Sequence, residues 1–285
     1  MVFDTLIGID RLATRLSDPG WRVFDCRFDL ADTGRGRLAH RESHLPDAVY
    51  AHLDLDLSGP ITPQSGRHPL PDPSRLGGWL SKCGVGPDTQ VVAYDDTGGT
   101  MAVRLWWLLR WLGHDRVAVL DGGWQAWVQA DLPLQTSPPR VPEASRFTGT
   151  PDSRLVVGTE TLDRQLQTGD TSLQLVDART RERYRGDAEP IDPVAGHIPG
   201  AVNLPLQDNL DSEGRFRSAD ALRDRYTAIL GDRPPETVVA MCGSGVTACH
   251  NLLAMERAGL HGGLLYAGSW SEWIRDPRRP VATGD

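Results

Sequence analysis

Short runs of apolar residues alternate with longer segments of helical periodicity along the chain. An unbroken apolar run predicts a strand that is buried on both faces, and apolar positions three or four residues apart predict a helix with one buried face. Strands that alternate with helices indicate an α/β fold with mostly parallel sheets flanked by helices. The predicted strands are 23–24, 91–94, 117–120, 173–176, 238–241 and 264–266, and the predicted helices are 101–112, 124–127, 219–230 and 247–258.

The second half of the chain repeats the first. Residues 102–127 and 248–273 align without a gap, and each matched pair is 146 positions apart. Two long copies indicate a duplicated domain, because solenoid arrays use shorter and more numerous units. We expect an N-terminal domain over 1–135, a linker rich in Pro, Ser and Thr over 136–153, and a C-terminal domain over 154–285. The matched pairs include Ala102 and Ala248, Gly113 and Gly259, Gly122 and Gly268, Trp124 and Trp270, and Trp127 and Trp273.

A cysteine stands directly after the predicted strand 238–241. Cys242 opens the loop Cys-Gly-Ser-Gly-Val-Thr, which leads into the predicted helix 247–258. This place, at the carboxyl end of a parallel strand, is the usual ligand site of an open α/β sheet. Gly243 and Gly245 allow a turn whose N–H groups point inward, and the helix behind adds partial positive charge. These surroundings favour the thiolate, so we predict that Cys242 is a nucleophile and not a buried structural thiol.

The residues of this loop limit the reactions in which Cys242 can take part. A cysteine phosphatase needs an arginine six residues after the cysteine to stabilise a phosphoryl transition state, and this chain has Ala248 there. A smaller cargo held by N–H groups, such as one sulfur atom, fits better. The matching loop of the first copy, 95–101, contains two aspartates and no cysteine. We therefore expect the first copy to be catalytically inactive.

Composition and charge limit the classes of partner. The 285 residues are 39% hydrophobic and 24% charged, as in ordinary soluble proteins, and no apolar run is long enough to predict a membrane span. A net charge of −8 argues against nucleic acid as a partner. The four cysteines form no Cys-x-x-Cys pair, which argues against a zinc ribbon. The N-terminal residues lack a signal-peptide pattern, so we expect a cytoplasmic protein with reduced thiols.

The loop from Cys242 to Ala248 resembles the active-site loop of the rhodanese superfamily. Its Gly243-Ser244 pair resembles the members that use 3-mercaptopyruvate, whereas members that prefer thiosulfate typically carry Arg-Lys at these positions. The resemblance covers nearly the whole chain and implies two tandem rhodanese-like domains, of which the second is catalytic. It implies a sulfurtransferase that works through a Cys242 persulfide without a metal or an organic cofactor. The implied partners are a small anionic sulfur donor and a thiol, cyanide or thioredoxin-like acceptor, and we expect a monomer or weak dimer.

The resemblance also implies which residues form the site. Ser244 would hydrogen-bond the charge that develops during transfer, and His68 and Asp54, from the first copy, would act on that serine as a relay. Arg183 would bind the carboxylate of the donor, and the loop backbone would hold the transferred sulfur. The expected catalytic residues are Cys242, Ser244, His68 and Asp54, and the expected substrate-binding residues are Arg183, Gly243, Gly245, Val246 and Thr247.

Two other functions stay open at this point. Relatives that use 3-mercaptopyruvate usually carry a second arginine near position 191, where this chain has Ile191. This difference favours a thiosulfate:cyanide sulfurtransferase. A non-catalytic module that relays or senses persulfide sulfur is the other alternative, and it would show no turnover with a small donor. We expect structural roles for Arg179 as a partner of Asp177, and for His44, His197 and Cys249.

Overall fold

The computed structural model describes residues 2–140 and 143–285, which form two compact units. Unit 1 comprises the described residues of Met1–Gly59, Leu70–Asp152 and Ser212–Arg215. Unit 2 comprises Pro60–Pro69, Ser153–Asp211 and Phe216–Asp285. A segment from the first half of the chain, Pro60–Pro69, thus belongs to the second unit. Residue 1 of the expected N-terminal domain and residues 141–142 of the expected linker lie outside the described residues, and the domain bounds stay a prediction.

Unit 1 is built on a five-stranded sheet in which all neighbouring strands are parallel. The strand order is β1-β5-β4-β2-β3, so the chain crosses over helices to return to the sheet. Strands β1 and β3 are only two residues long, and the strands at the centre are longer. The strands are β1 Leu6–Ile7, β2 Trp21–Asp25, β3 Val49–Tyr50, β4 Gln90–Tyr94 and β5 Val117–Leu120, and the helices are α1 Ile9–Ala13, α2 Arg35–Glu42, α3 Pro73–Lys82, α4 Ala102–Trp111 and α5 Gly123–Gln129.

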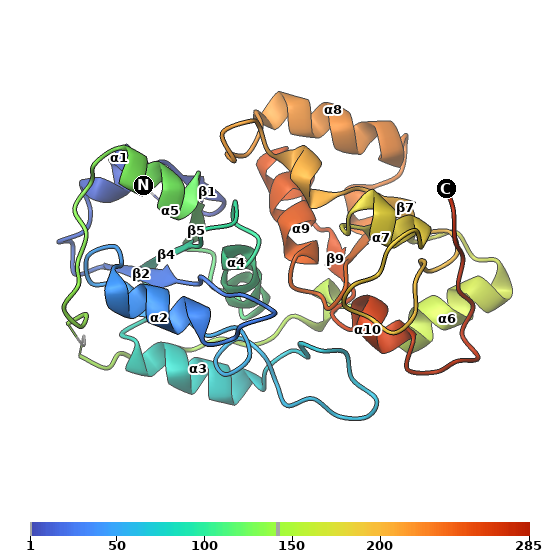
Figure 1. Ribbon diagram of the computed structural model, residues 1–285, viewed down its shortest axis with the longest axis horizontal. Coiled ribbons are helices and arrows are strands. Elements are labelled where there is room, and N and C mark those ends of the chain that lie inside the picture. Colours follow the sequence, from blue (N-terminus) through green and yellow to red (C-terminus); the bar gives the residue numbers. More distant parts are fainter. Residues whose placement is uncertain (1, 141–142) are drawn as a thin grey trace. The chain divides into compact units, whose positions relative to one another are not determined.

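Helices cover both faces of this sheet, and successive side chains of β2 pack against opposite faces. Val23 packs in one core with α1 and with Trp127 of α5. Phe24 points to the opposite face, where its ring lies 5.4 Å from that of Trp79 in α3. Figure 1 shows α1 and α5 on one side of these strands and α3 on the other. The apolar runs in the sequence are therefore strands covered on both faces, as predicted.

Unit 2 repeats this plan on a four-stranded parallel sheet of order β7-β6-β8-β9. Helices α6 and α10 share one core with β6 and β8, and α8 and α9 lie on the other side of the sheet (Figure 1). The strands are β6 Gln174–Asp177, β7 Val202–Asn203, β8 Val238–Met241 and β9 Leu264–Leu265. The helices are α6 Thr159–Thr168, α7 Arg181–Arg185, α8 Ala219–Leu230, α9 Ala248–Arg257 and α10 Ser269–Trp273, with 3-10 turns at Ser153–Leu155, Leu206–Asn209 and Pro235–Thr237.

The repeated tryptophans and histidines have the same contacts in each unit. Trp127 donates its indole N–H to the carbonyl of Pro133, and Trp273 does the same to Pro280, each at 2.9 Å. His44 exchanges backbone hydrogen bonds with Gln135, and His197 exchanges them with Ala282. These contacts tie the end of each copy to its own core and fit the expected structural role of both histidines.

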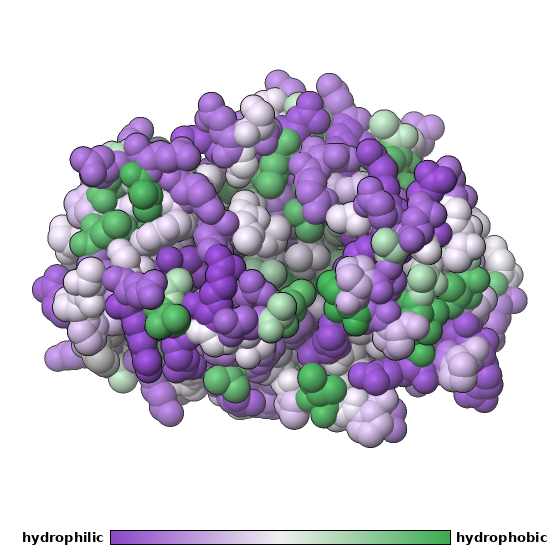
Figure 2. Space-filling model, viewed as in Figure 1, coloured by the Kyte–Doolittle hydropathy of each residue, from purple (hydrophilic) through white to green (hydrophobic). Residues whose placement is uncertain are grey.

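Figure 2 shows a surface on which hydrophilic residues predominate and hydrophobic residues occur in small separate groups. Such scattered apolar side chains are normal on a protein surface. Among the residues that the structure describes, no helix combines the length and hydrophobicity that a membrane span requires.

Candidate functional site

The loop that follows β8 surrounds the sulfur of Cys242. The backbone N–H of Gly245 points at this sulfur, at an N–Sγ distance of 3.1 Å. Gly245 has φ of +75°, and a Cβ there would lie 2.3 Å from the carbonyl oxygen of Ala267, so only glycine fits this turn. Helix α9 begins directly after the loop, with Thr247 as its N-cap residue. The side chain of Cys242 is 1% exposed, and the inward-pointing N–H that the sequence predicted for this loop is present at Gly245.

Ser269, at the start of α10, holds the backbone of Cys242. Its hydroxyl accepts the N–H of Cys242 at 3.0 Å and donates to the carbonyl of Tyr266 at 2.9 Å. Ser269 has φ of +53°, a left-handed conformation that is uncommon for residues other than glycine. The equivalent residue of unit 1 is Gly123, with the same φ of +53°. The hydroxyl is therefore a feature of unit 2 alone, where the cysteine is.

The corresponding loop of unit 1 holds a carboxylate. Asp95 matches Cys242, because Tyr94 and Met241 occupy the same place in the register of the two sheets. The backbone N–H groups of four residues donate to the Asp95 carboxylate at 2.7–2.9 Å, namely Thr97, Gly99, Met101 and Ala102. A loop of this type thus gathers several N–H donors around one negative charge. No cysteine stands there, so unit 1 lacks a nucleophile at this position.

The structure brings His68 to Ser244. The two side chains share a hydrogen bond of 2.7 Å between Nδ1 and Oγ, and both are buried. His68 belongs to the Pro60–Pro69 segment, which is part of unit 2. Asp54, the third member of the expected relay, belongs to unit 1, where its backbone N–H donates to Nδ1 of His52. Its role in the relay stays a prediction.

Arg183 of α7 lies beside the loop and is held by acids of its own unit. Its guanidinium forms ion pairs with Glu189 at 2.8 Å and Asp192 at 3.1 Å. A Cβ on Gly243 would lie 3.5 Å from Nη2 of Arg183, so the guanidinium reaches the residue next to the nucleophile. Although burial opposes it, the hydrogen bonds from Arg183 and the nearby backbone hold the pKa of Glu189 below its ordinary value. Glu189 is therefore ionised at neutral pH.

Arg179 forms the predicted pair with Asp177. The two side chains are 1% and 0% exposed and 2.7 Å apart, and Arg179 also donates to the carbonyl of Gly196. Its guanidinium lies over the ring of Trp270, 4.8 Å from the centroid. Unit 1 contains the same arrangement, formed by Arg27 and Asp25 with Trp124. The pair is present in both units, which fits the expected structural role of Arg179.

The other thiols lie in different surroundings. Cys249 is buried in α9, and its thiol donates to the carbonyl of Gly245 at 3.5 Å. Burial and the charge of Asp25 raise the pKa of Cys26 well above its ordinary value. Burial, with a contribution from Asp56, raises the pKa of Cys83 to about 12. Cys26 and Cys83 are therefore protonated and unreactive at neutral pH.

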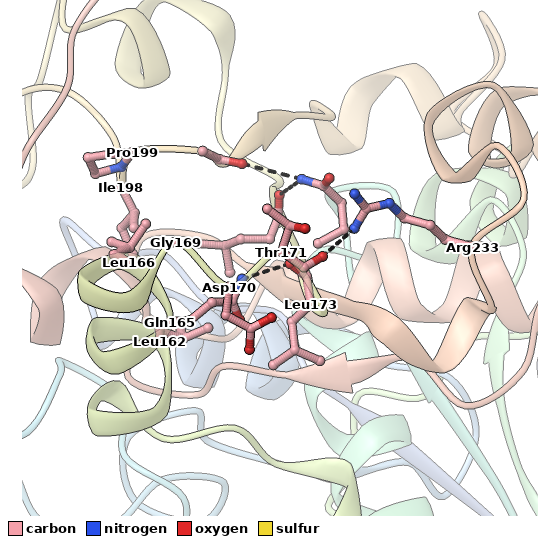
Figure 3. Close-up of a pocket in the computed structure, with 13 residues that line it drawn as sticks. Leu162, Gln165, Leu166, Gly169, Asp170, Thr171, Leu173, Ile198, Pro199 and Arg233 are labelled. Carbon is pink, nitrogen blue, oxygen red and sulfur yellow. Dashed lines mark hydrogen bonds between the residues drawn. The ribbon is translucent and has the colours of Figure 1, made fainter.

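A cavity of about 210 Å³ lies elsewhere in unit 2 (Figure 3). It is bounded by α6 and by the residues that precede β6 and β7, and Arg233 closes one side by donating to the carbonyl of Thr171 at 2.7 Å. Because Cys242 follows the opposite, carboxyl end of β8, this cavity is not the site of thiol chemistry. Within the described part of the chain, no group of three or more His, Cys, Asp or Glu side chains is arranged to hold a metal ion.

Sequence reasoning missed two residues of this site. Ser269 carried a weak signal, because the repeat aligns it with a glycine. Arg67 carried no such signal. Its guanidinium lies beside Gly243, because a Cβ on Gly243 would be 2.9 Å from Nη2 of Arg67, and it forms an ion pair with Asp192. Ile191, where a second arginine was sought, is 44% exposed.

Comparison with known proteins agrees with this geometry. The family model of the rhodanese-like domain matches residues 9–130 and 159–276. The chain is 51% identical over 282 residues, 98% of each chain, to the "Probable 3-mercaptopyruvate sulfurtransferase" of Pseudomonas aeruginosa. It is 35% identical to the thiosulfate sulfurtransferase of Mus musculus, over 93% of this chain and 88% of the mouse protein. The structure of 3-mercaptopyruvate sulfurtransferase from Leishmania major superposes with a TM-score of 0.84 and 29% identity, over 96% of this chain and 76% of that one. The chain therefore belongs to the rhodanese family, with two rhodanese-like domains, and is an enzyme of the sulfurtransferase class.

Proposed function

We propose that this enzyme transfers the sulfur of 3-mercaptopyruvate to a thiophilic acceptor through a persulfide on Cys242. The observation that carries the proposal is the N–H of Gly245, which is aimed at the sulfur of Cys242 from 3.1 Å. The Asp95 loop supports it, because four N–H groups there surround a single negative charge. A terminal persulfide sulfur carries such a charge.

In the first step, the Cys242 thiolate attacks the sulfur of the donor. A sulfur–sulfur bond forms, the carbon–sulfur bond breaks, and its electron pair remains on the carbon as an enolate of pyruvate. The proton of the donor's thiol ends on that carbon, so the products are pyruvate and a Cys242 persulfide anion. Backbone N–H groups of residues 243–248 would stabilise this anion.

Ser244 and His68 are placed to move that proton. Their shared hydrogen bond of 2.7 Å links a hydroxyl two residues from the nucleophile to an imidazole, the side chain best suited to proton transfer near neutral pH. The serine would hydrogen-bond the oxygen of the enolate while the histidine passes the proton. Asp54 stays the expected third member of this relay.

In the second step, an acceptor attacks the outer sulfur of the persulfide. Cyanide, a small thiol or a thioredoxin-like protein supplies the nucleophile, the sulfur–sulfur bond breaks, and its electron pair returns to Cys242 as the thiolate. The two half-reactions are independent, so the kinetics are of the ping-pong type. No redox cofactor or metal takes part in this scheme.

Mass spectrometry tests the intermediate directly. After treatment with 3-mercaptopyruvate and no acceptor, the peptide that contains Cys242 is expected to gain about 32 Da, the mass of one sulfur, and to lose it when cyanide is added. Cys249→Ser is the matched control, because Cys249 lies in the same peptide region and is also buried. The gain should persist in this variant. Sulfur found on Cys249 in the unaltered protein would contradict the proposal.

Replacement of His68 by asparagine is expected to lower kcat with 3-mercaptopyruvate about 100-fold. Asparagine places a hydrogen-bonding atom near the position of Nδ1 but cannot carry a proton. Transfer from thiosulfate should change little, because sulfite leaves without needing a proton. His261→Asn, at an exposed histidine, is the control. An equal loss with both donors would show that His68 only supports the loop.

The ratio of kcat/KM for the two donors decides between the two sulfurtransferase functions. We expect 3-mercaptopyruvate to be favoured, since the loop carries Gly243-Ser244 and the relatives include an enzyme of that name at 51% identity. A preference for thiosulfate would favour the alternative, and no turnover with either donor would favour a persulfide relay module. The acceptor, the cytoplasmic location and the monomeric or weakly dimeric state stay predictions.

A further inference from the structure

The Pro60–Pro69 segment is fixed to α10 of unit 2. The N–H of Arg67 donates to the hydroxyl of Ser271 at 3.0 Å, and the carbonyl of Ser65 accepts from Arg275 at 3.2 Å. Gly66 packs so closely that a Cβ would lie 2.6 Å from the carbonyl oxygen of Gly268. The backbone on either side of Arg67 is thus held in place, and its side chain projects toward the loop of Cys242.

Two guanidinium groups therefore meet beside the residue next to the nucleophile. A Cβ on Gly243 would lie 2.9 Å from Nη2 of Arg67 and 3.5 Å from Nη2 of Arg183. Both arginines contact Asp192, whose side chain is 3% exposed, on its two different oxygens. Two positive charges repel each other, and nearby carboxylates offset this repulsion. Asp192 pairs with both arginines, and Glu189 pairs with Arg183.

The acids leave one donor of Arg67 unused. Among the described residues, Nε of Arg67 is a buried polar atom without a hydrogen-bond partner. A buried unpaired donor is destabilising, and this one belongs to a guanidinium whose Nη2 borders Gly243. Nε and Nη2 are adjacent on one edge of the guanidinium, and that edge matches the two oxygens of a carboxylate.

We propose that Arg67 binds the carboxylate of the sulfur donor together with Arg183. This proposal rests on the proposed function for the identity of the donor, a 2-oxo carboxylate. Asp192 orients the two guanidinium groups, and the edge of Arg67 that carries Nε and Nη2 receives the substrate. Gly243 is required between them, because any side chain at that position would occupy the space of the carboxylate.

Alkylation of Cys242 tests this without any sulfur transfer. Iodoacetate carries a carboxylate and iodoacetamide is a neutral molecule of nearly the same size, and both form a thioether with release of iodide. The ratio of their rates at Cys242, followed by mass spectrometry of its peptide, reports carboxylate binding beside the thiol. Arg67→Ala and Arg183→Ala are each expected to lower the iodoacetate-to-iodoacetamide ratio about 10-fold or more, as for loss of a charge-assisted hydrogen bond.

Two controls make the result specific. Arg181→Ala removes a charge from the same helix as Arg183, but Arg181 is 69% exposed and pairs with Asp208, so the ratio should not change. The double variant Arg67→Ala/Asp192→Asn restores the local charge balance. If its ratio returned to that of the unaltered protein, the effect would come from an unbalanced Asp192, and the proposal would be wrong.

Kinetics complete the test. Arg67→Ala should raise KM for 3-mercaptopyruvate about 10- to 100-fold, and Arg67→Lys should recover only part of the loss, because an ammonium lacks the planar fork. An unchanged alkylation ratio in a folded Arg67→Ala protein would overturn the proposal even with sulfur transfer intact. A changed ratio in a protein that transfers no sulfur from either donor would reject the proposed function and leave the anion site in place.

Discussion

Replacement of Cys242 by serine is expected to abolish sulfur transfer from either donor, with a fall in kcat of about 10⁴-fold or more. The hydroxyl of serine is slightly smaller than the thiol and can accept a hydrogen bond from the N–H of Gly245, so the loop should keep its conformation. Its oxygen, however, is a weak nucleophile toward sulfur and cannot form a persulfide. The measurement is the steady-state rate of thiocyanate formation with cyanide as the acceptor.

Two further measurements show whether the loss of sulfur transfer comes from the missing thiol or from a change in the fold. Circular dichroism and the urea midpoint of Cys242→Ser should match those of the unaltered protein, and Cys249→Ser should retain transfer, because the thiol of Cys249 donates to the carbonyl of Gly245 from within α9. Persistent thiocyanate formation in Cys242→Ser would place the nucleophile elsewhere. The protonated thiols of Cys26 and Cys83 offer no replacement at neutral pH.

Removal of Arg179 should produce the largest loss of stability among the site variants. Arg179→Ala is expected to lower the free energy of unfolding by about 3–5 kcal/mol, because it leaves the carboxylate of Asp177 buried without its cation. The variant also loses the contact with the ring of Trp270. Urea denaturation followed by tryptophan fluorescence gives this difference.

An exposed pair provides the comparison. Arg181→Ala breaks the ion pair with Asp208, in which the two side chains are 69% and 42% exposed, and stability should change little because water screens such charges. If Arg179→Ala instead kept its stability and lost sulfur transfer, Arg179 would act in the chemistry and its structural role would be wrong.

The two units show how one loop geometry serves two side chains. In unit 1 the Asp95 carboxylate accepts four backbone N–H groups and thereby completes its own anion site. In unit 2 the sulfur of Cys242 takes the place of the carboxylate and accepts a hydrogen bond from the N–H of Gly245. The carboxylate of unit 1 thus has its hydrogen bonds without a ligand, whereas the proposed function gives unit 2 one more charged atom, the outer sulfur of a persulfide. Under that proposal the first copy is structural and the second is reactive.

The periodicity of apolar residues predicted the α/β class and the central strands, but not the two-residue strands β1, β3 and β7 or the helices α1, α2, α3, α6 and α7. Central strands such as β8 and β5 coincide with their predicted bounds, because they are buried on both faces and their sequences contain little else than apolar residues. Helix α9 begins at Ala248, one residue after the predicted start, since Thr247 is the N-cap. The candidate nucleophile Cys242 could also be named from the sequence, because its loop, its glycines and its helix are contiguous in the chain, and its role stays a prediction.

By itself, then, the sequence determined the α/β class, the duplication and the cysteine, all of which depend on neighbours in the chain. Only the tertiary structure showed that Arg67 lies beside Gly243 and that Ser269 binds the backbone of Cys242, and it brought His68, which the family resemblance had implied, to Ser244. His68 and Ser244 are 176 positions apart, and Arg67 and Ser271 are 204 apart. The segment that carries His68 and Arg67 belongs to the first copy in sequence and to the second unit in space. No local pattern encodes such contacts, because they arise from the packing of one irregular segment against a distant helix.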